Sequence, residues 1–112
     1  MQHQMKLSSV PFGKIVRREK VIESRLNDEK RQEIQVGDSI EFSENDHPEN
    51  VVNARVKGVL RYQKFSDLFD DLNPSLFGGE SSESLLEEIK RFYSDEEEAK
   101  YGVVGVRIEM ID

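Results

Sequence analysis

The stretch Val51-Val-Asn-Ala-Arg-Val-Lys-Gly58-Val-Leu-Arg-Tyr62 is the longest strand candidate of the chain, and it decides the fold. Apolar and polar side chains alternate along it, as expected for a strand with one buried face. The apolar face is predicted to carry Val52, Ala54, Val56, Leu60 and Tyr62, and the polar face Asn53, Arg55, Lys57 and Arg61. Gly58 interrupts the stretch, which predicts a β-bulge or sharp bend of the kind that small barrels need at their corners.

Shorter elements surround this stretch. Strands are predicted at His3–Leu7, at Val21–Leu26, around Ile40 and Phe42, and from about Val103 onward. Helices are predicted from Ser8 or Ser9 to Val16, from Phe65 to Leu72 and from Ser82 to Tyr93, with capping boxes at Ser84/Glu87 and Ser94/Glu97. Turns or connections are predicted at Asn27–Arg31, Asn45–Asn50 and Leu76–Glu80. Strands and helices do not alternate regularly, so we expect an α+β fold, a small mixed β-barrel with flanking helices, in one domain over residues 1–112.

The composition narrows the function classes. The chain has 112 residues, no cysteine and a net charge of −7. The lack of cysteine excludes disulfides and zinc–thiolate sites. No apolar run approaches the ~20 residues that a membrane helix needs, and we expect a cytoplasmic protein with no membrane contact. The acidic balance disfavours an indiscriminate nucleic-acid coat, although the acids concentrate in the second half of the chain.

Three charged residues close together form the main candidate site. Lys20 immediately precedes the predicted strand Val21–Leu26, and Glu23 and Arg25 lie two positions apart within that strand, so they point to the same face. An arginine fork can donate two parallel hydrogen bonds to a phosphate or a base carbonyl, and a carboxylate can accept from an exocyclic amine. The alternative is a salt bridge that only orders the polar face of the sheet, worth under ~1 kcal/mol if exposed.

Other candidates are weaker. Arg61, with its basic neighbours, extends a phosphate-binding stripe or else belongs to a solvated strand face. Tyr101 precedes a glycine at the start of the last strand, where its ring is open to stack on a base. His3 and His47 are far apart in the sequence, so no metal site and no cofactor are expected.

Five short motifs, taken in order, resemble the ASCH domain. They are Phe12-x-x-Ile15, Lys20-x-x-Glu23-x-Arg25, Val36-Gly37-Asp38-x-Ile40-x-Phe42, Val56-x-x-x-x-Arg61-Tyr62-x-x-Phe65 and Tyr101-Gly102-Val103-Val104-x-Val106. The resemblance covers about Met5 to Met110 and is strongest to the small stand-alone prokaryotic type. It implies a PUA-like β-barrel and a cleft beside Lys20, Glu23 and Arg25 that binds RNA or a modified nucleoside.

One branch of the resembling family hydrolyses N4-acetylcytidine with a lysine, a threonine and a glutamate. Lys20 matches the lysine, Glu23 stands at the position of the threonine, and Glu80 falls near the glutamate. We therefore keep two hypotheses. The first is a monomeric module that binds RNA or a modified nucleoside through Lys20, Glu23, Arg25, Arg61 and Tyr101. The second is a small amidohydrolase that uses Lys20, Glu23 and Glu80; whether the chain is an enzyme stays open.

Overall fold

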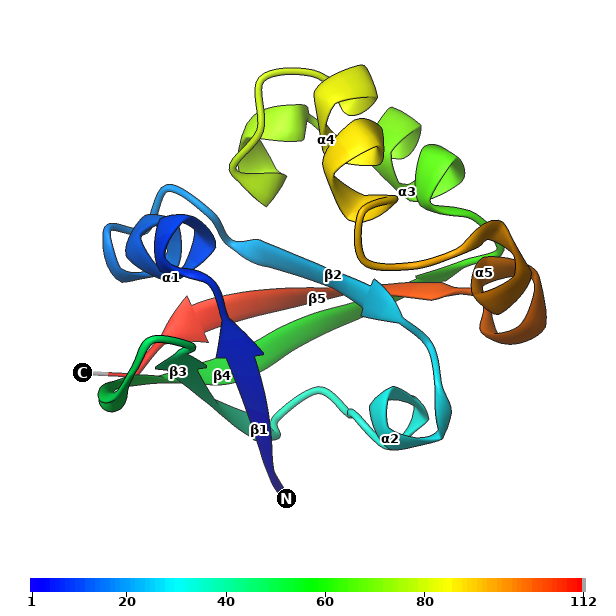
Figure 1. Ribbon diagram of the computed structural model, residues 1–112. Coiled ribbons are helices and arrows are strands. Elements are labelled where there is room, and N and C mark those ends of the chain that lie inside the picture. Colours follow the sequence, from blue (N-terminus) through cyan, green and yellow to red (C-terminus); the bar gives the residue numbers. More distant parts are fainter. Residues whose placement is uncertain (112) are drawn as a thin grey trace.

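The computed structural model describes residues 1–111 and shows a curled sheet with helices at its ends (Figure 1). The elements in chain order are β1 (Gln2–Leu7), α1 (Ser9–Val16), β2 (Ile22–Leu26), α2 (Glu29–Gln32), β3 (Ser39–Glu44), β4 (His47–Tyr62), α3 (Phe65–Asp71), the 3-10 helix η1 (Pro74–Phe77), α4 (Ser82–Ile89), α5 (Asp95–Tyr101) and β5 (Val103–Met110). The predicted α+β class is confirmed.

The five strands form one mixed sheet in the order β1-β3-β4-β5-β2. β1 and β3 are parallel, and the other neighbours are antiparallel. The sheet curls into a half-barrel, so its two edge strands, β1 and β2, approach each other across an open seam (Figure 1). Arg25 of β2 crosses the seam, because its Nη2 donates to the Lys6 carbonyl of β1 at 2.8 Å.

The bulge predicted at Gly58 is present, but it changes which residues share a face. The register of β4 against β5 shifts between Val56 and Gly58. An extra residue in one strand inverts the alternation beyond it. Val59 therefore follows Val56 toward the inner core, and Leu60 and Tyr62 pack on the opposite side. The prediction that Leu60 and Tyr62 continue the face of Val56 was wrong for this reason.

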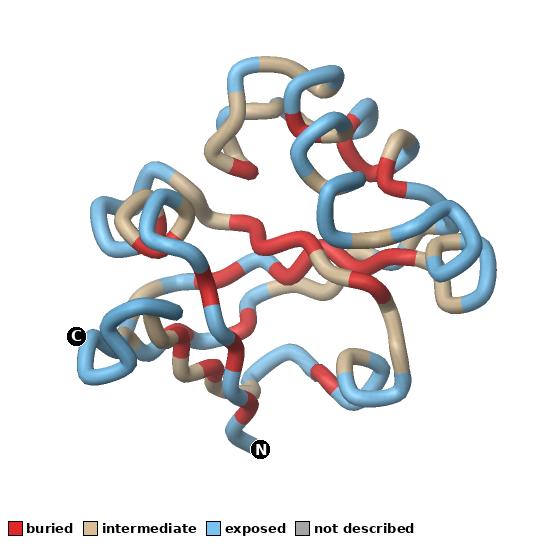
Figure 2. The backbone as a smooth tube through the Cα atoms, viewed as in Figure 1, coloured by how far each residue is buried: buried red, intermediate tan, exposed pale blue. Residues whose placement is uncertain are grey.

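Two apolar clusters hold the fold together, one on each side of the sheet. The inner cluster fills the half-barrel beneath α1 and consists of Met5, Leu7, Phe12, Ile15, Ile34, Ile40, Phe42, Ala54, Val56, Val104, Val106 and Ile108. The outer cluster lies under α3, η1 and α4 and consists of Ile22, Leu26, Phe65, Leu68, Phe69, Phe77, Leu85 and Val103. Buried residues follow the strands and recur in the helices (Figure 2). The strand predicted around Ile40 and Phe42 is confirmed, and both side chains are buried in the inner cluster.

The helical layer differs from the prediction at two places and agrees with it at a third. Helix α4 ends at Ile89 and not at Tyr93 as predicted. The chain turns after Ile89, and the Tyr93 ring stacks on Phe65 at 5.8 Å. The helix begins at Ser82 as predicted, so its capping box joins Ser81, the residue directly before it, to Ser84 and not Ser84 to Glu87. The capping box of Ser94 with Glu97 is confirmed.

Two predicted connections also have more structure than expected. The segment before Gly78 forms the 3-10 helix η1, and its last residue, Phe77, is buried in the outer cluster. The predicted turn Asn45–Asn50 shrinks to Asn45 and Asp46, because β4 already begins at His47. Pairing with β3 extends this strand beyond what the polar composition suggested.

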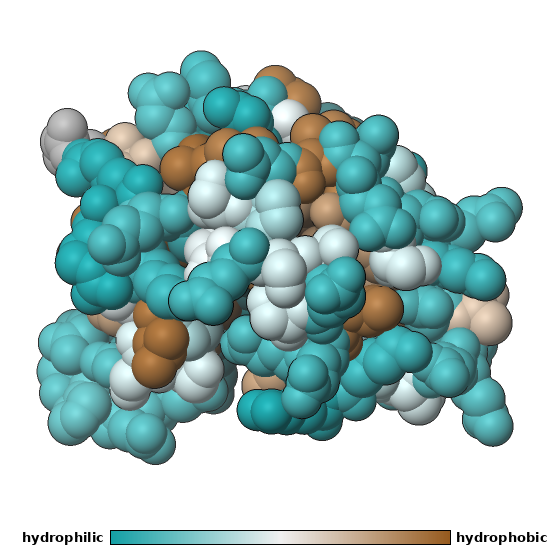
Figure 3. Space-filling model, turned by 90° about the horizontal axis from the view of Figure 1, so that it is seen from above, coloured by the Kyte–Doolittle hydropathy of each residue, from teal (hydrophilic) through white to brown (hydrophobic). Residues whose placement is uncertain are grey.

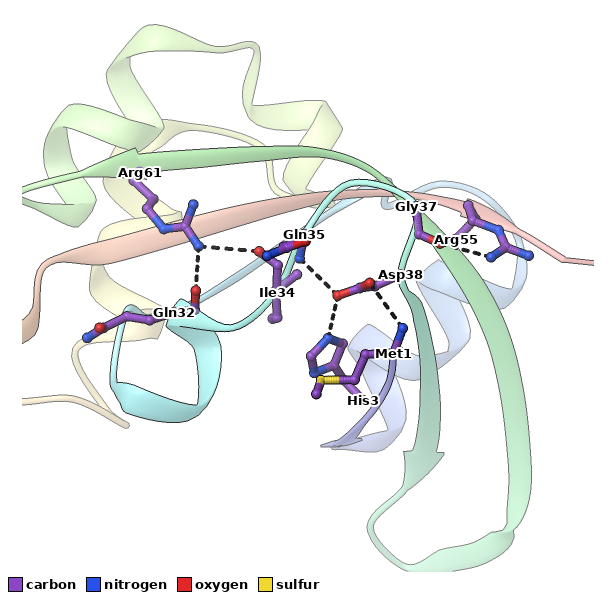
Figure 4. A network of polar contacts seen from close by, with 9 residues as sticks. All are labelled: Met1, His3, Gln32, Ile34, Gln35, Gly37, Asp38, Arg55 and Arg61. Atoms are coloured by element: carbon purple, nitrogen blue, oxygen red, sulfur yellow. Dashed lines mark hydrogen bonds and ion pairs between the residues drawn. The ribbon is translucent and has the colours of Figure 1, made fainter.

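A polar network fixes the segment between α2 and β3 at the end of the half-barrel (Figure 4). The Asp38 carboxylate lies 2.8 Å from His3 Nε2 and accepts from the Gln35 amide at 3.0 Å. It also accepts from the Met1 amino group at 3.2 Å. On the other side of the segment, Arg61 donates to the carbonyl of Ile34 at 3.4 Å. The hydrogen bonds to the Asp38 carboxylate lower its pKa to about 2, mainly the one with His3 and then the one from the Gln35 amide.

This network predicts an acid-sensitive contribution to stability. A lowered pKa stabilises the folded state above the unfolded value of about 3.9, and that contribution is lost as the pH falls toward 2. Asp38→Asn removes it, so the variant loses less stability than the parent between pH 4 and pH 2. Urea unfolding at pH 6, 4, 3 and 2 measures the difference, with Asp46→Asn in the exposed β3–β4 turn as the control. An Asp38→Asn variant that loses stability as steeply as the parent contradicts this assignment.

Candidate functional site

β2 places two of the three predicted site residues on one face, and the turn before it supplies the third. Lys20 Nζ lies 3.0 Å from Glu23 Oε1, and Arg25 Nε donates to Glu23 Oε2 at 2.8 Å. Glu23 is only 4% exposed, and the side chains of Lys20 and Arg25 are 12% and 14% exposed. The three predicted side chains therefore meet, and each oxygen of the carboxylate faces its own cation.

The electrostatics keep this group ionised. Burial by itself raises the pKa of Glu23, but the charges and hydrogen bonds of Lys20 and Arg25 outweigh it and lower the pKa. Burial likewise lowers the pKa of Arg25, and the interactions with Glu23 and then Tyr93 outweigh it and raise the pKa. The group of one carboxylate and two cations therefore has a net charge of +1.

A cavity of about 290 Å³ adjoins the three charged side chains. Its walls come from α1, β1, β2 and the helical layer, and they include Lys6, Val10, Pro11, Lys14, Lys20, Glu23, Ser24, Arg25, Phe69, Phe77, Leu85, Glu88, Ile89, Phe92 and Tyr93. One wall is thus charged, and the wall from the helical layer is apolar and aromatic. Val10 and Phe92 are each 66% exposed. Apolar patches interrupt a mainly hydrophilic surface on the side seen from above (Figure 3).

Sequence reasoning missed Lys14, which crosses from α1 to the helical layer. Its Nζ donates to the Gly78 carbonyl at 2.7 Å. The carbonyl is presented by a residue in the left-handed region, with φ of 79°, directly after η1. The spacing of Val10 and Lys14, four positions apart on α1, was the available signal, because it puts both on a helix face other than that of Phe12 and Ile15.

The other predicted site residues lie elsewhere. Arg61 donates to Asn27 Oδ1 at 3.2 Å and to backbone carbonyls near α2. Tyr101 lines a separate, open hollow together with Tyr62 and Lys100, whose Nζ is 5.0 Å from the centre of the Tyr101 ring. Glu80 is exposed in the connection before α4. None of these three lines the cavity beside Lys20 in the described part of the chain.

No helix within residues 1–111 is both long and apolar enough to cross a bilayer. No group of three or more histidine, aspartate or glutamate side chains in the same range is arranged to hold a metal ion.

A model of the ASCH domain matches residues 5–112. The chain belongs to the ASCH family. Structures described as ASCH domains have a similar fold: one from Lactobacillus crispatus has a TM-score of 0.62 and 14% identity over 97% of this chain and 79% of that one. A mutant ASCH protein from Zymomonas mobilis has a TM-score of 0.60 and 13% identity over 97% and 72%. At these identities the likeness concerns the fold of the ASCH domain alone.

Two solved structures are more similar to this ASCH protein. The hypothetical protein PH0355 has a TM-score of 0.87 and 34% identity over 99% of this chain and 100% of that one. A protein from Pyrococcus furiosus, solved by NMR in solution, has a TM-score of 0.77 and 34% identity over 100% and 99%. No curated protein matches the chain. The ASCH protein therefore shares its whole length with these relatives.

Proposed function

We propose that this ASCH domain binds single-stranded RNA or a modified nucleoside in the cavity beside Lys20, Glu23 and Arg25. The observation that carries the proposal is the cavity itself, which joins a buried, fully charged group to an aromatic wall. RNA bases are read when they are unstacked, by hydrogen bonds to their edges and by stacking on aromatic rings. PUA-like ASCH domains are also the class to which RNA binding is attributed, which supports the same ligand class.

Each residue has a distinct part in this proposal. Glu23 holds the two cations in place, because each of its oxygens faces one of them. Lys20 and Arg25 then present to carbonyl or phosphate oxygens of the ligand the N–H donors that Glu23, the Lys6 carbonyl and Tyr93 do not use. Phe92 offers an exposed ring on the wall from the helical layer, and Tyr93, which interacts with Arg25, lies next to it in the chain. The proposal places a flat heterocycle against this aromatic surface.

A second candidate, an amidohydrolase for N4-acetylcytidine, has one observation in its favour. Lys20 and Glu23 are paired at 3.0 Å beside a cavity, an arrangement that general acid–base catalysis uses. Glu80, the third residue of that hypothesis, is exposed and outside the cavity lining. Incubation with N4-acetylcytidine tests this candidate, since release of cytidine that depends on Lys20 supports it and binding without turnover leaves only the first proposal.

Arg25→Lys tests the binding proposal. Lysine keeps the charge, but it lacks the fork that reaches Glu23 Oε2 and the Lys6 carbonyl together. We expect the parent to bind a short single-stranded RNA or a member of a nucleoside panel saturably, and Arg25→Lys to bind it about tenfold more weakly.

Isothermal titration calorimetry measures both affinities. The matched control is Arg55→Lys, because Arg55 is exposed and donates to the Gly37 carbonyl away from the cavity. We expect this control to bind as the parent does. Equal affinities for all three proteins, or no binding by the parent to any member of the panel, contradict the proposal.

A further inference from the structure

Positive charge exceeds negative charge around the cavity, although the chain as a whole carries −7. The lining residues include four cations and two carboxylates, namely Lys6, Lys14, Lys20, Arg25, Glu23 and Glu88. A surplus of one sign of charge around a cleft attracts ions of the opposite sign. The surplus of two positive charges favours a ligand that brings its own negative charge.

Lys14 and Lys6 are the two cations of the cavity lining that no carboxylate among residues 1–111 compensates. The hydrogen-bond partner of Lys14 is a neutral carbonyl, that of Gly78 at 2.7 Å, whereas Lys20 and Arg25 share the carboxylate of Glu23. An ammonium has three N–H donors, so two of those on Lys14 are without a partner among residues 1–111. The Gly78 contact also fixes the direction of this half-buried side chain before any ligand arrives.

The opposite wall sets the rest of the ligand. Phe92 and Val10 leave apolar surface uncovered at the cavity, and Tyr93 adds a second ring. A volume of about 290 Å³ is at the lower end of ligand pockets, which run from about 300 to 1,000 Å³. The cavity therefore suits one flat, apolar unit with an anionic group attached, and not a longer stretch of polymer.

We propose that the cavity binds a nucleotide, a base that carries its own phosphate, in preference to the corresponding nucleoside. This inference rests on the proposed function and specifies its ligand class. The phosphate is bound by the free donors of Lys14 with Lys6 beside it, and the base lies against Phe92 and Tyr93. A free mononucleotide and the phosphorylated end of an RNA share this chemistry.

Calorimetric titrations compare ribonucleosides with their 5′- and 3′-monophosphates, and a short RNA with and without a 5′-phosphate. We expect a monophosphate to bind at least about tenfold more tightly than its nucleoside, with the gap narrowing as salt is added. Lys14→Gln closes this gap, and Lys14→Arg retains it. Lys57→Gln is the control, since Lys57 is exposed on β4 outside the cavity lining. We expect this variant to keep the difference in affinity between monophosphate and nucleoside.

The RNA arm separates the two sources. A gain from the 5′-phosphate on RNA equal to that of the mononucleotide assigns the site to an RNA end, and a gain confined to mononucleotides assigns it to a free nucleotide. Nucleosides that bind as tightly as their monophosphates overturn this inference and leave the proposed function standing. A gap that survives in Lys14→Gln also overturns it. No binding of any probe contradicts the proposed function, and the inference falls with it.

Discussion

Glu23→Gln lowers the free energy of unfolding by about 3 kcal/mol or more, because removing one member of a buried ionic group leaves its partners uncompensated. Glutamine has nearly the shape of glutamate, so packing is retained and the charge is the only large change. Lys20 and Arg25 then face each other with 12% and 14% of their side chains exposed and no carboxylate between them. Guanidinium or urea unfolding at neutral pH measures the loss.

An exposed pair on the same chain provides the control. Arg17 Nε donates to Glu19 Oε2 at 2.8 Å, the same distance as in the Arg25–Glu23 pair, but both side chains are more than half exposed. Glu19→Gln should cost no more than about 1 kcal/mol, since solvent screens such pairs. If Glu23→Gln costs as little as Glu19→Gln, then Glu23 does not organise the site electrostatically.

Phe65→Ala is expected to cost about 3–5 kcal/mol, because it opens a void in the outer cluster. Phe65 is 1% exposed, and its ring stacks on Phe69 at 5.9 Å and on Tyr93 at 5.8 Å. Both neighbours line the cavity, so the same substitution loosens the aromatic wall. Thermal and urea unfolding give the stability, and ligand titration of the folded variant gives the effect on binding.

Phe92→Ala separates the two effects of Phe65→Ala. Phe92 lines the same cavity but is 66% exposed, so its truncation should change the free energy of unfolding by less than about 0.5 kcal/mol. Ligand binding should nevertheless weaken, since a stacking surface worth about 1–3 kcal/mol per base is removed. A large loss of stability in Phe92→Ala, or unchanged binding, contradicts the assignment of this ring to the ligand.

The charged group could be predicted from the sequence because its geometry is local. Glu23 and Arg25 share a face by the two-residue period of a strand, and Lys20 is held in the adjoining turn. The strands were found for the same reason, since Ile40 and Phe42 alternate with polar neighbours in β3. The bulge at Gly58 was also predicted, but its effect on the faces beyond it depends on the pairing with β5, which no local pattern contains.

The rest of the cavity could not be predicted because it is built by residues far apart in the chain. Lys14 and Gly78 meet only after α1 has packed on the inner cluster and the helical layer on the outer cluster. Phe92 and Tyr93 looked like the end of a helix, and tertiary contact with Phe65 ends that helix early instead. Tyr101, although aromatic and near a strand, lies at a different hollow for the same tertiary reason.

The central claim is that the ligand binds between the charged face of β2 and the aromatic wall of the helical layer. Backbone amide shifts of the labelled protein, followed during titration with nucleotides and short RNA, test it most directly. We predict saturable shifts at Lys14, at residues 20–25 and at Phe92 and Tyr93. Shifts concentrated around Tyr101 and Lys100 instead, or no saturable shift at any amide, would contradict the account.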